Sequence, residues 1–187
     1  RLVAHDIRHV DGGSVFRVRY DGKELGEVKL AVPGQHNIRN ALAALACGIG
    51  PWGLTVQQMA PGLERFVGAE RRFERLGNAK GIEVVDDYAH HPTEVRATLA
   101  AAREAFPGRR IVAAFQPHLF SRTRDFAREF GEALALADVV FLCDIYPARE
   151  QPIAGVSSAL IGDAMTELGR MPQWTGPRSA AAAALGG

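Results

Sequence analysis

Two runs of the sequence gather side chains that can bind anions and transfer protons. The first, Asp86–Pro92, contains two carboxylates, a tyrosine and two adjacent histidines. The second, Gln116–Arg124, contains one histidine and two arginines. Imidazole exchanges protons near neutral pH, and a guanidinium group binds carboxylates and phosphates through paired N–H groups. These residue types predict a site that holds an anionic substrate and moves a proton.

The first run also admits a second interpretation, a metal centre. Carboxylates and imidazoles at short spacing are typical ligands of Zn²⁺ or Mn²⁺, and a metal-dependent hydrolase could use them. The four residues concerned are Asp86, Asp87, His90 and His91. With no cysteine nearby and no second cluster of this kind, the sequence favours a substrate-binding loop, in which Asp87 caps the following helix.

Two upstream segments could bind a nucleotide. His36 and Asn37 stand at the start of a helical pattern, where free N–H groups can hold an anion. The alternative is that they only cap the helix. Arg71 and Arg72 could place a guanidinium group against a phosphate or a purine ring, or could belong to a solvated linker. The residues alone leave both alternatives open.

The first part of the chain shows the patterns of a β-hairpin followed by helices. Apolar residues alternate from Ser14 to Val32, interrupted by a turn signal at Asp21-Gly22. Helical spacing begins at Asn37 and again at Thr55. The polar residues 68–80 that follow predict a domain boundary.

Beyond this boundary, short apolar strands alternate with helices. The predicted strands are 82–85, 111–115 and 139–142, and the predicted helices are 92–106, 126–137 and 157–168. This order predicts an α/β domain with a Rossmann-like, doubly wound, mostly parallel sheet, whose strand 111–115 is buried on both faces. Ligands bind at the carboxyl ends of such strands, so the polar strand ends should form one rim. These ends are Asp86–Pro92, Gln116–Arg124 and Cys143–Tyr146.

Composition excludes several classes of protein. The 187 residues are 47% hydrophobic and 23% charged, with a net charge of +1, which is typical of a globular chain and argues against nucleic acid as a partner. The apolar runs are too short for membrane insertion. Cys47 and Cys143 lie among apolar neighbours, which predicts two buried thiols of a cytosolic protein. The absence of an initiator methionine and the alanine-rich end suggest a piece of a longer chain.

Three segments, taken in order, resemble the Mur ligase family, the ATP-dependent amino-acid ligases of peptidoglycan synthesis. They are Gly34–Ala44 (GQHNIRNALAA), Arg71–Glu74 (RRFE) and Asp86–Pro92 (DDYAHHP). Within the family, DDYAHHPTE and the segment Phe115–His118 (FQPH) resemble the members that join L-alanine to UDP-N-acetylmuramate. The murein tripeptide recycling ligases share the AHHP segment and are the alternative within the family.

The resemblance implies a domain organisation and a set of ligands. Residues 1–70 correspond to the end of the central ATP-binding domain, and 71–187 to most of the C-terminal Rossmann-like domain. The family is bacterial and cytoplasmic and uses ATP with Mg²⁺. No Gly-x-x-x-x-Gly-Lys-Ser/Thr segment is present, so the P-loop and the main Mg²⁺ ligands are expected upstream and the isolated chain is expected to be inactive. The expected partners are the two small-molecule substrates and the missing segments of the same chain.

The resemblance also implies roles for individual residues. The nucleotide-binding set is His36, Asn37, Asn40, Arg72, Asp87 and Tyr88, in which the asparagines meet the adenine edge and Asp87 meets the ribose. The catalytic set is His90, His118 and Arg122. His118 and Arg122 match positions that face the incoming alanine, and His90, with Tyr88, would lie between the nucleotide and the alanine. Some relatives carry an arginine at the position of Leu119; its absence here places more of the carboxylate recognition on Arg122. Either His90 or His118 could accept the amine proton.

Overall fold

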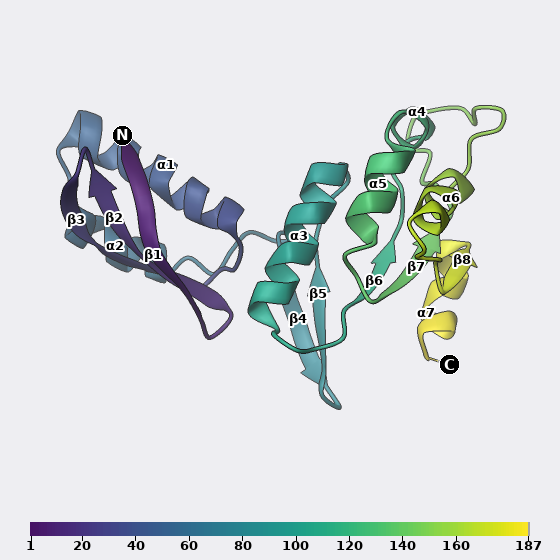
Figure 1. The fold of residues 1–187 in the computed structure, drawn as a ribbon, viewed down its shortest axis with the longest axis horizontal. Coiled ribbons are helices and arrows are strands. Elements are labelled where there is room, and N and C mark those ends of the chain that lie inside the picture. The colour runs from purple at the N-terminus through teal and green to yellow at the C-terminus, as the bar shows by residue number, and fades with distance from the viewer. Residues whose placement is uncertain (187) are drawn as a thin grey trace. The chain divides into compact units, whose positions relative to one another are not determined.

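The computed structural model describes residues 1–186, and the chain divides into two compact units (Figure 1). The first unit consists of Arg1–Tyr88 and Ala100–Pro107, and the second of Ala89–Leu99 and Gly108–Gly187. The helix α3 (Pro92–Ala105) therefore begins in the second unit and ends in the first.

The first unit opens with a three-stranded antiparallel sheet. Its strands are β1 (Leu2–Val10), β2 (Gly13–Tyr20) and β3 (Lys23–Leu30), paired in chain order. The turn at Asp21-Gly22 has positive φ at both residues, 44° and 83°, as a two-residue hairpin requires. The predicted hairpin is confirmed, because the alternation of apolar residues and this turn act together to set its register.

Two helices cover one face of this sheet. In α1 (Gln35–Trp52) the residues Ile38, Ala41 and Leu45 are buried and pack with the apolar face of the strands. The second helix, α2 (Val56–Glu64), begins with a capping box in which Thr55 and Gln58 satisfy each other's backbone N–H groups. Both helices start close to the predicted positions.

The polar segment that predicted a boundary contains a strand. β4 (Glu74–Ala79) pairs antiparallel with β5 (Ile82–Asp86) through a two-residue turn at Lys80-Gly81, where both residues have positive φ. The expectation that residues 82–85 belong to the parallel sheet is wrong, because their partner is β4. The sequence did not predict β4, because its residues are mostly polar and exposed and show no apolar alternation. Once β4 forms, the two-residue turn is enough to pair it with β5.

The second unit has the predicted α/β architecture with a parallel sheet. Its strands β6 (Val112–Phe115), β7 (Val139–Cys143) and β8 (Trp174–Gly176) lie in that order and pair in parallel. The connecting and flanking helices are α4 (Phe120–Asp125), α5 (Ala127–Leu134), α6 (Ala159–Glu167) and α7 (Arg178–Gly186).

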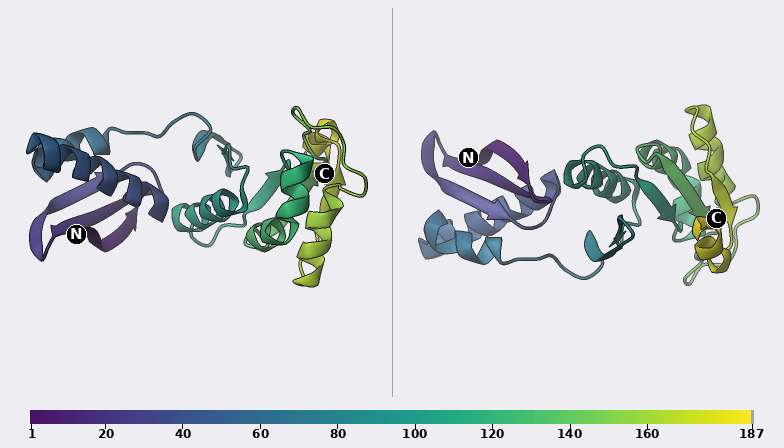
Figure 2. Two further views of the ribbon diagram at one scale, coloured as in Figure 1. Left: turned by 90° about the horizontal axis from the view of Figure 1, so that it is seen from above. Right: turned by 90° about the horizontal axis from the view of Figure 1, so that it is seen from below.

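The core of this unit joins helices α3, α5 and α6 to strands β6 and β7 (Figure 2). Phe130, Leu134, Leu142, Ile161 and Met165 are almost completely buried in it. Burying side chains of this size contributes about 1.5–3 kcal/mol each relative to exposure, so this core holds the strand ends in place.

Two expectations about the chain need correction, one for β6 and one for Cys47. β6 is not buried on both faces, since Val112 is 40% exposed. The predicted helix 126–137 is present as α5, which begins at Ala127 and ends at Leu134; Phe126, with φ of −127°, separates it from the short helix α4, which the sequence did not predict. Cys143 is buried, but Cys47 is exposed, since the buried face of α1 follows Ala41, Leu45 and Gly48 and leaves Cys47 on another face.

No helix in residues 1–186 is both long enough and apolar enough to cross a membrane.

Candidate functional site

A pocket of about 450 Å³ lies in the first unit beside the first turns of α1. Its polar lining consists of His36, Asn37, Asn40 and Arg72, and Leu30, Val32, Leu63 and Phe66 are among its apolar residues. This volume and this mixture of apolar walls with a few polar groups are typical of a small-molecule site. The structure thus brings four of the six expected nucleotide-binding residues to one cavity.

The start of α1 orients the two asparagines. The Nδ2 atom of Asn37 donates to the carbonyl oxygen of Pro33 at 2.7 Å, and its Oδ1 atom lies 3.5 Å from Nδ2 of Asn40. Gly34 is the N-cap residue, with φ of 96° and no side-chain cap. Asn37 therefore does not act as the N-cap; its side chain ties the helix to the preceding strand end and aligns Asn40 on the pocket face.

His36 lies in the same pocket in a neutral state. Burial lowers its pKa below 6.5, and the nearby charge of Asp87 only partly opposes this effect. A neutral imidazole retains one donor and one acceptor nitrogen, so His36 can form hydrogen bonds to a polar ligand without adding charge.

The last two nucleotide-set residues, Asp87 and Tyr88, follow β5 and are held by the segment that precedes β4. The Oδ2 atom of Asp87 accepts from the backbone N–H of Phe73 at 2.9 Å, and the backbone N–H of Tyr88 donates to the carbonyl of Arg71 at 2.7 Å. The Arg71 guanidinium lies 4.7 Å from the centre of the Tyr88 ring. Arg71 is therefore part of this structure rather than a solvated linker.

His90, His118 and Arg122 form a second group, in the second unit. The Nη1 atom of Arg122 lies 3.3 Å from the carbonyl oxygen of His90 and 3.5 Å from Nδ1 of His118. The two imidazole rings are 6.2 Å apart, centre to centre. One cation and two proton-transfer groups therefore converge at one place, where they can bind a carboxylate and receive a proton.

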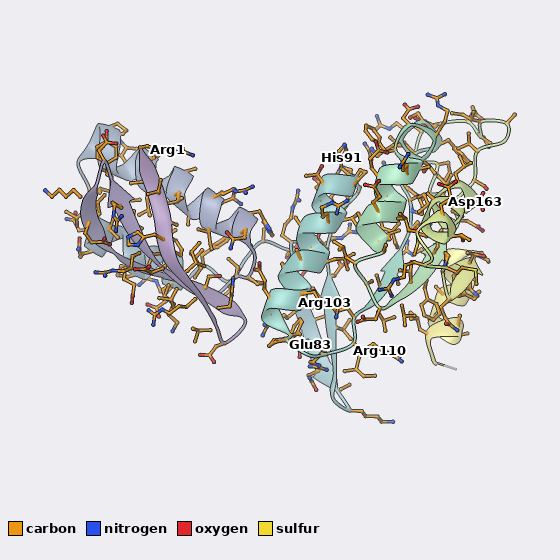
Figure 3. All side chains as sticks on the ribbon, viewed as in Figure 1. Arg1, Glu83, His91, Arg103, Arg110 and Asp163 are labelled. Carbon is orange, nitrogen blue, oxygen red and sulfur yellow. The ribbon has the colours of Figure 1, made fainter. Side chains whose placement is uncertain are left out.

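The first turn of α3 positions His90. The Oε2 atom of Glu94 accepts from the backbone N–H groups of His90 and His91, at 2.9 and 3.2 Å, and lies 3.4 Å from Nδ1 of His90. A carboxylate beside Nδ1 favours a proton on that atom. His91 stands at the beginning of α3 (Figure 3), where its ring packs on Phe126 at 5.0 Å.

His118 is held in the neutral state. Its pKa is lowered below 6.5, first by burial and then by the positive charge of Arg122 and by His90. Because the Arg122 guanidinium faces Nδ1, the neutral ring keeps its proton on Nε2. His118 is then a hydrogen-bond donor through Nε2.

The metal-centre interpretation finds no support in the side-chain geometry. Within residues 1–186 no group of three or more His, Cys, Asp or Glu side chains is arranged to hold a metal ion. Asp86 instead pairs with Arg71 at 3.3 Å. We therefore derive no step through a metal bound by these residues.

Sequence reasoning missed the residues that hold the second group. Glu94 had a local signal, since a glutamate in the first turn of a helix commonly binds the preceding N–H groups. Leu119 has φ of 77°, which is strained for a leucine, and Thr123 bonds to its carbonyl oxygen from a fully buried position. Nothing in the sequence indicates such a backbone conformation.

Comparisons with known proteins agree with this fold. The family model "Mur ligase, glutamate ligase domain" matches residues 71–186. The UDP-N-acetylmuramate–L-alanine ligase of Pelodictyon phaeoclathratiforme is 48% identical over 171 residues, which cover 90% of this chain and 36% of the relative. The corresponding ligase of Kineococcus radiotolerans is 51% identical over 183 residues, covering 96% of this chain and 39% of that protein.

A solved structure gives the same result. The UDP-N-acetylmuramate–alanine ligase of Thermotoga maritima matches with a TM-score of 0.77 and 32% identity, over 94% of this chain and 37% of the other. The chain thus spans a little over a third of the length of these relatives. The matched domain covers more than half of the described residues, and the chain belongs to the Mur ligase family.

Proposed function

We propose that the complete gene product containing this chain joins L-alanine to UDP-N-acetylmuramate with consumption of ATP. The relatives that are about half identical over most of the chain carry this activity in their names. The structural observation that carries the proposal is the convergence of Arg122, His118 and His90, because an amino acid offers one carboxylate to bind and one ammonium proton to remove.

The pocket beside α1 is the proposed adenine site. Its apolar walls suit the faces of a purine, and the amides of Asn37 and Asn40 can pair with the donors and acceptors on the ring edge. Arg72 supplies a positive charge for the phosphates, and Asp87 and Tyr88 supply groups for the ribose. On this assignment residues 1–70 are the end of an ATP-binding domain and residues 71–187 a C-terminal domain.

The proposed reaction has two steps. The carboxylate of UDP-N-acetylmuramate takes the γ-phosphoryl group of ATP, which gives an acyl phosphate and ADP. The alanine amine then attacks the carbonyl carbon, the new C–N bond forms, and the C–O bond to phosphate breaks. Phosphorylation is needed because a carboxylate is a poor electrophile, and the enzyme contributes mainly by positioning charged groups.

In the second step each of His90, His118 and Arg122 has its own role. An α-ammonium group has no lone pair until it loses a proton, and we assign the acceptance of that proton to the imidazole of His90, whose Nδ1 is held by Glu94. Arg122 binds the alanine carboxylate through paired N–H groups. His118 donates from Nε2 to a substrate oxygen.

Mg²⁺ would accompany ATP in this reaction and neutralise phosphate charge, as in other phosphoryl transfers. We assign none of its ligands to residues 1–186, which contain no suitable cluster. A cytoplasmic location is part of the proposal, since ATP and the uridine nucleotide substrate are found there.

The test is a ligation assay with the complete gene product, ATP, Mg²⁺, UDP-N-acetylmuramate labelled with ¹⁸O in its carboxylate, and L-alanine. We expect ADP, UDP-N-acetylmuramoyl-L-alanine and phosphate that carries ¹⁸O, because the acyl phosphate loses its bridging oxygen with the phosphate. Mass spectrometry measures both products. Unlabelled phosphate would contradict the acyl-phosphate step.

A parallel assay replaces L-alanine by the free murein tripeptide. Ligation of the tripeptide with no reaction of L-alanine would overturn the proposed substrate and would identify a recycling ligase. The 187-residue chain alone is the negative control, because it contains no P-loop motif.

A further inference from the structure

The carboxylate of Glu150 is bound to the first turn of α4, the helix that carries Arg122. The Oε2 atom of Glu150 accepts from the backbone N–H of Ser121 at 2.9 Å, and Oε1 accepts from the Ser121 hydroxyl. Glu150 lies in the segment that follows β7, twenty-nine residues after Ser121 in the sequence. One side chain of a distant loop therefore satisfies the backbone N–H and the hydroxyl of Ser121 at this helix start.

Backbone hydrogen bonds join the same two segments. The N–H of Leu119 donates to the carbonyl of Tyr146 at 3.0 Å, and the N–H of Tyr146 donates to the carbonyl of Pro117 at 2.8 Å. The parallel pairing that joins Phe115 to Leu142 thus resumes beyond the strand ends, with His118 opposite Tyr146. The loop after β7 therefore fixes the backbone on both sides of His118 through hydrogen bonds.

These hydrogen bonds hold a strained residue, Leu119. Leu119 has φ of 77°, in the left-handed region that a leucine side chain disfavours. Its N–H is held by Tyr146, and its carbonyl accepts from the N–H and the hydroxyl of Thr123, at 3.1 and 2.9 Å. A strained peptide persists only when its surroundings over-determine it, so the contacts from both sides are needed.

We propose that Glu150 is a positioning residue, whose carboxylate fixes the first turn of α4 so that Arg122 stays in reach of His90 and His118. It does so by holding Ser121, the residue next to Arg122, through two hydrogen bonds. The kinetic part of this inference rests on the proposed function; the structural part does not.

Charge and hydrogen bonding agree with this role. The two bonds from Ser121 lower the pKa of Glu150, so its carboxylate is ionised at neutral pH. The same negative charge raises the pKa of His118, against the larger effects of burial and Arg122. Glu150 therefore acts on both His118 and Arg122 without belonging to their group.

The kinetic test compares Glu150→Ala and Glu150→Gln with Glu129→Ala in the complete gene product. Glu129 is an exposed carboxylate in the first turn of the neighbouring helix α5, which makes it a matched control. Glutamine keeps one oxygen for the Ser121 N–H, whereas alanine keeps none. We expect the KM for L-alanine to rise about tenfold in Glu150→Ala, less in Glu150→Gln and not in Glu129→Ala, with the KM for ATP unchanged.

The structural test uses the complete gene product and requires no catalysis. Amide hydrogen exchange at Ser121 should accelerate in Glu150→Ala, less in Glu150→Gln and not in Glu129→Ala. An NMR titration should show a lower pKa of His118 in both Glu150 variants, because a negative charge is lost. If Glu150→Ala lowers the midpoint of thermal unfolding, Glu150→Gln is the variant to compare with Glu129→Ala.

The outcomes separate the two proposals. A folded Glu150 variant with unchanged Ser121 exchange and an unchanged KM for L-alanine would overturn the positioning role. Equal increases in the KM for L-alanine and for ATP would also overturn it, because they indicate a general loss of structure. A wild-type protein that does not ligate L-alanine would refute the proposed function, while exchange at Ser121 would still report on Glu150.

Discussion

The Nη1 atom of Arg122 lies 3.5 Å from Nδ1 of His118, and both residues follow the carboxyl end of β6. A guanidinium N–H can donate to this nitrogen only when the imidazole is unprotonated there. The same positive charge lowers the pKa of His118. The cation and the neutral imidazole therefore stabilise each other, and this relationship leads to the first two predictions.

Replacing Arg122 by lysine should weaken the binding of L-alanine. An ammonium group cannot form two parallel N–H bonds to a carboxylate, so we expect the KM for L-alanine to rise at least about tenfold, or about 1.4 kcal/mol. The KM values for ATP and UDP-N-acetylmuramate should change little. The control is Arg124→Lys on the same helix, where the exposed arginine pairs with Asp125. An unchanged KM for L-alanine would place carboxylate recognition elsewhere.

The stability of the chain should fall as the pH falls below 6.5. The folded-state pKa of His118 lies below its ordinary value of 6.5, and the pKa of His36 is lowered as well. Between the folded and unfolded pKa values the unfolded chain binds more protons, so the free energy of unfolding decreases as pH decreases through this window. Urea unfolding on both sides of pH 6.5 measures the effect.

The variant His118→Gln should make this pH dependence shallower, because it removes one of the two histidines whose pKa is lowered in the folded chain. An identical slope in the variant would mean that His118 titrates normally in the folded chain.

The two pocket asparagines should differ when each is replaced by alanine. Asn40→Ala should raise the KM for ATP with little change in stability, since Asn40 makes one long side-chain contact, to Asn37. Asn37→Ala should also destabilise the chain by about 1 kcal/mol, because it removes the hydrogen bond to Pro33. Thermal unfolding and ATP kinetics measure the two effects. Equal stability of both variants would contradict the role of Asn37 at the helix start.

Asp87→Asn should weaken ATP binding more than alanine binding. Asparagine keeps an oxygen for the N–H of Phe73 but loses the charge that a ribose-binding carboxylate uses. Loss of a hydrogen bond to a charged group is worth about 1.5–3 kcal/mol, so the KM for ATP should rise about ten- to hundredfold. A rise in the KM for L-alanine alone would refute the assignment of Asp87 to the nucleotide.

Thr123→Val should destabilise the start of α4. Valine keeps the shape of the side chain but cannot donate to the carbonyl of Leu119, and position 123 is fully buried. We expect a loss of about 1–3 kcal/mol, measured by urea unfolding of the 187-residue chain. A Thr166→Val variant removes the same type of bond, from Thr166 to the carbonyl of Gly162 within α6, at an exposed position away from the strained peptide. Because water can replace the bond at the exposed position, we expect a smaller loss there, and equal losses would contradict the larger cost expected at position 123.

Local patterns in the sequence were sufficient for most helices and strands. Apolar alternation with the Asp21-Gly22 turn predicted β2 and β3, and the spacing of Ile38, Ala41 and Leu45 predicted α1. These signals are reliable because each depends on residues a few positions apart, which meet on one face of an element whatever the rest of the chain does. The family resemblance has the same basis, since its motifs are short and contiguous.

The tertiary structure alone decided which strand pairs with which and what holds the site. β4 is polar and pairs with β5, which takes that strand out of the parallel sheet, and Cys47 is exposed. The contact of Glu150 with Ser121 and the strained φ of Leu119 arise from segments that only the packing of β6 against β7 brings together. Hydrogen bonds between residues far apart in sequence leave no periodic pattern, because their geometry exists only after the core has formed.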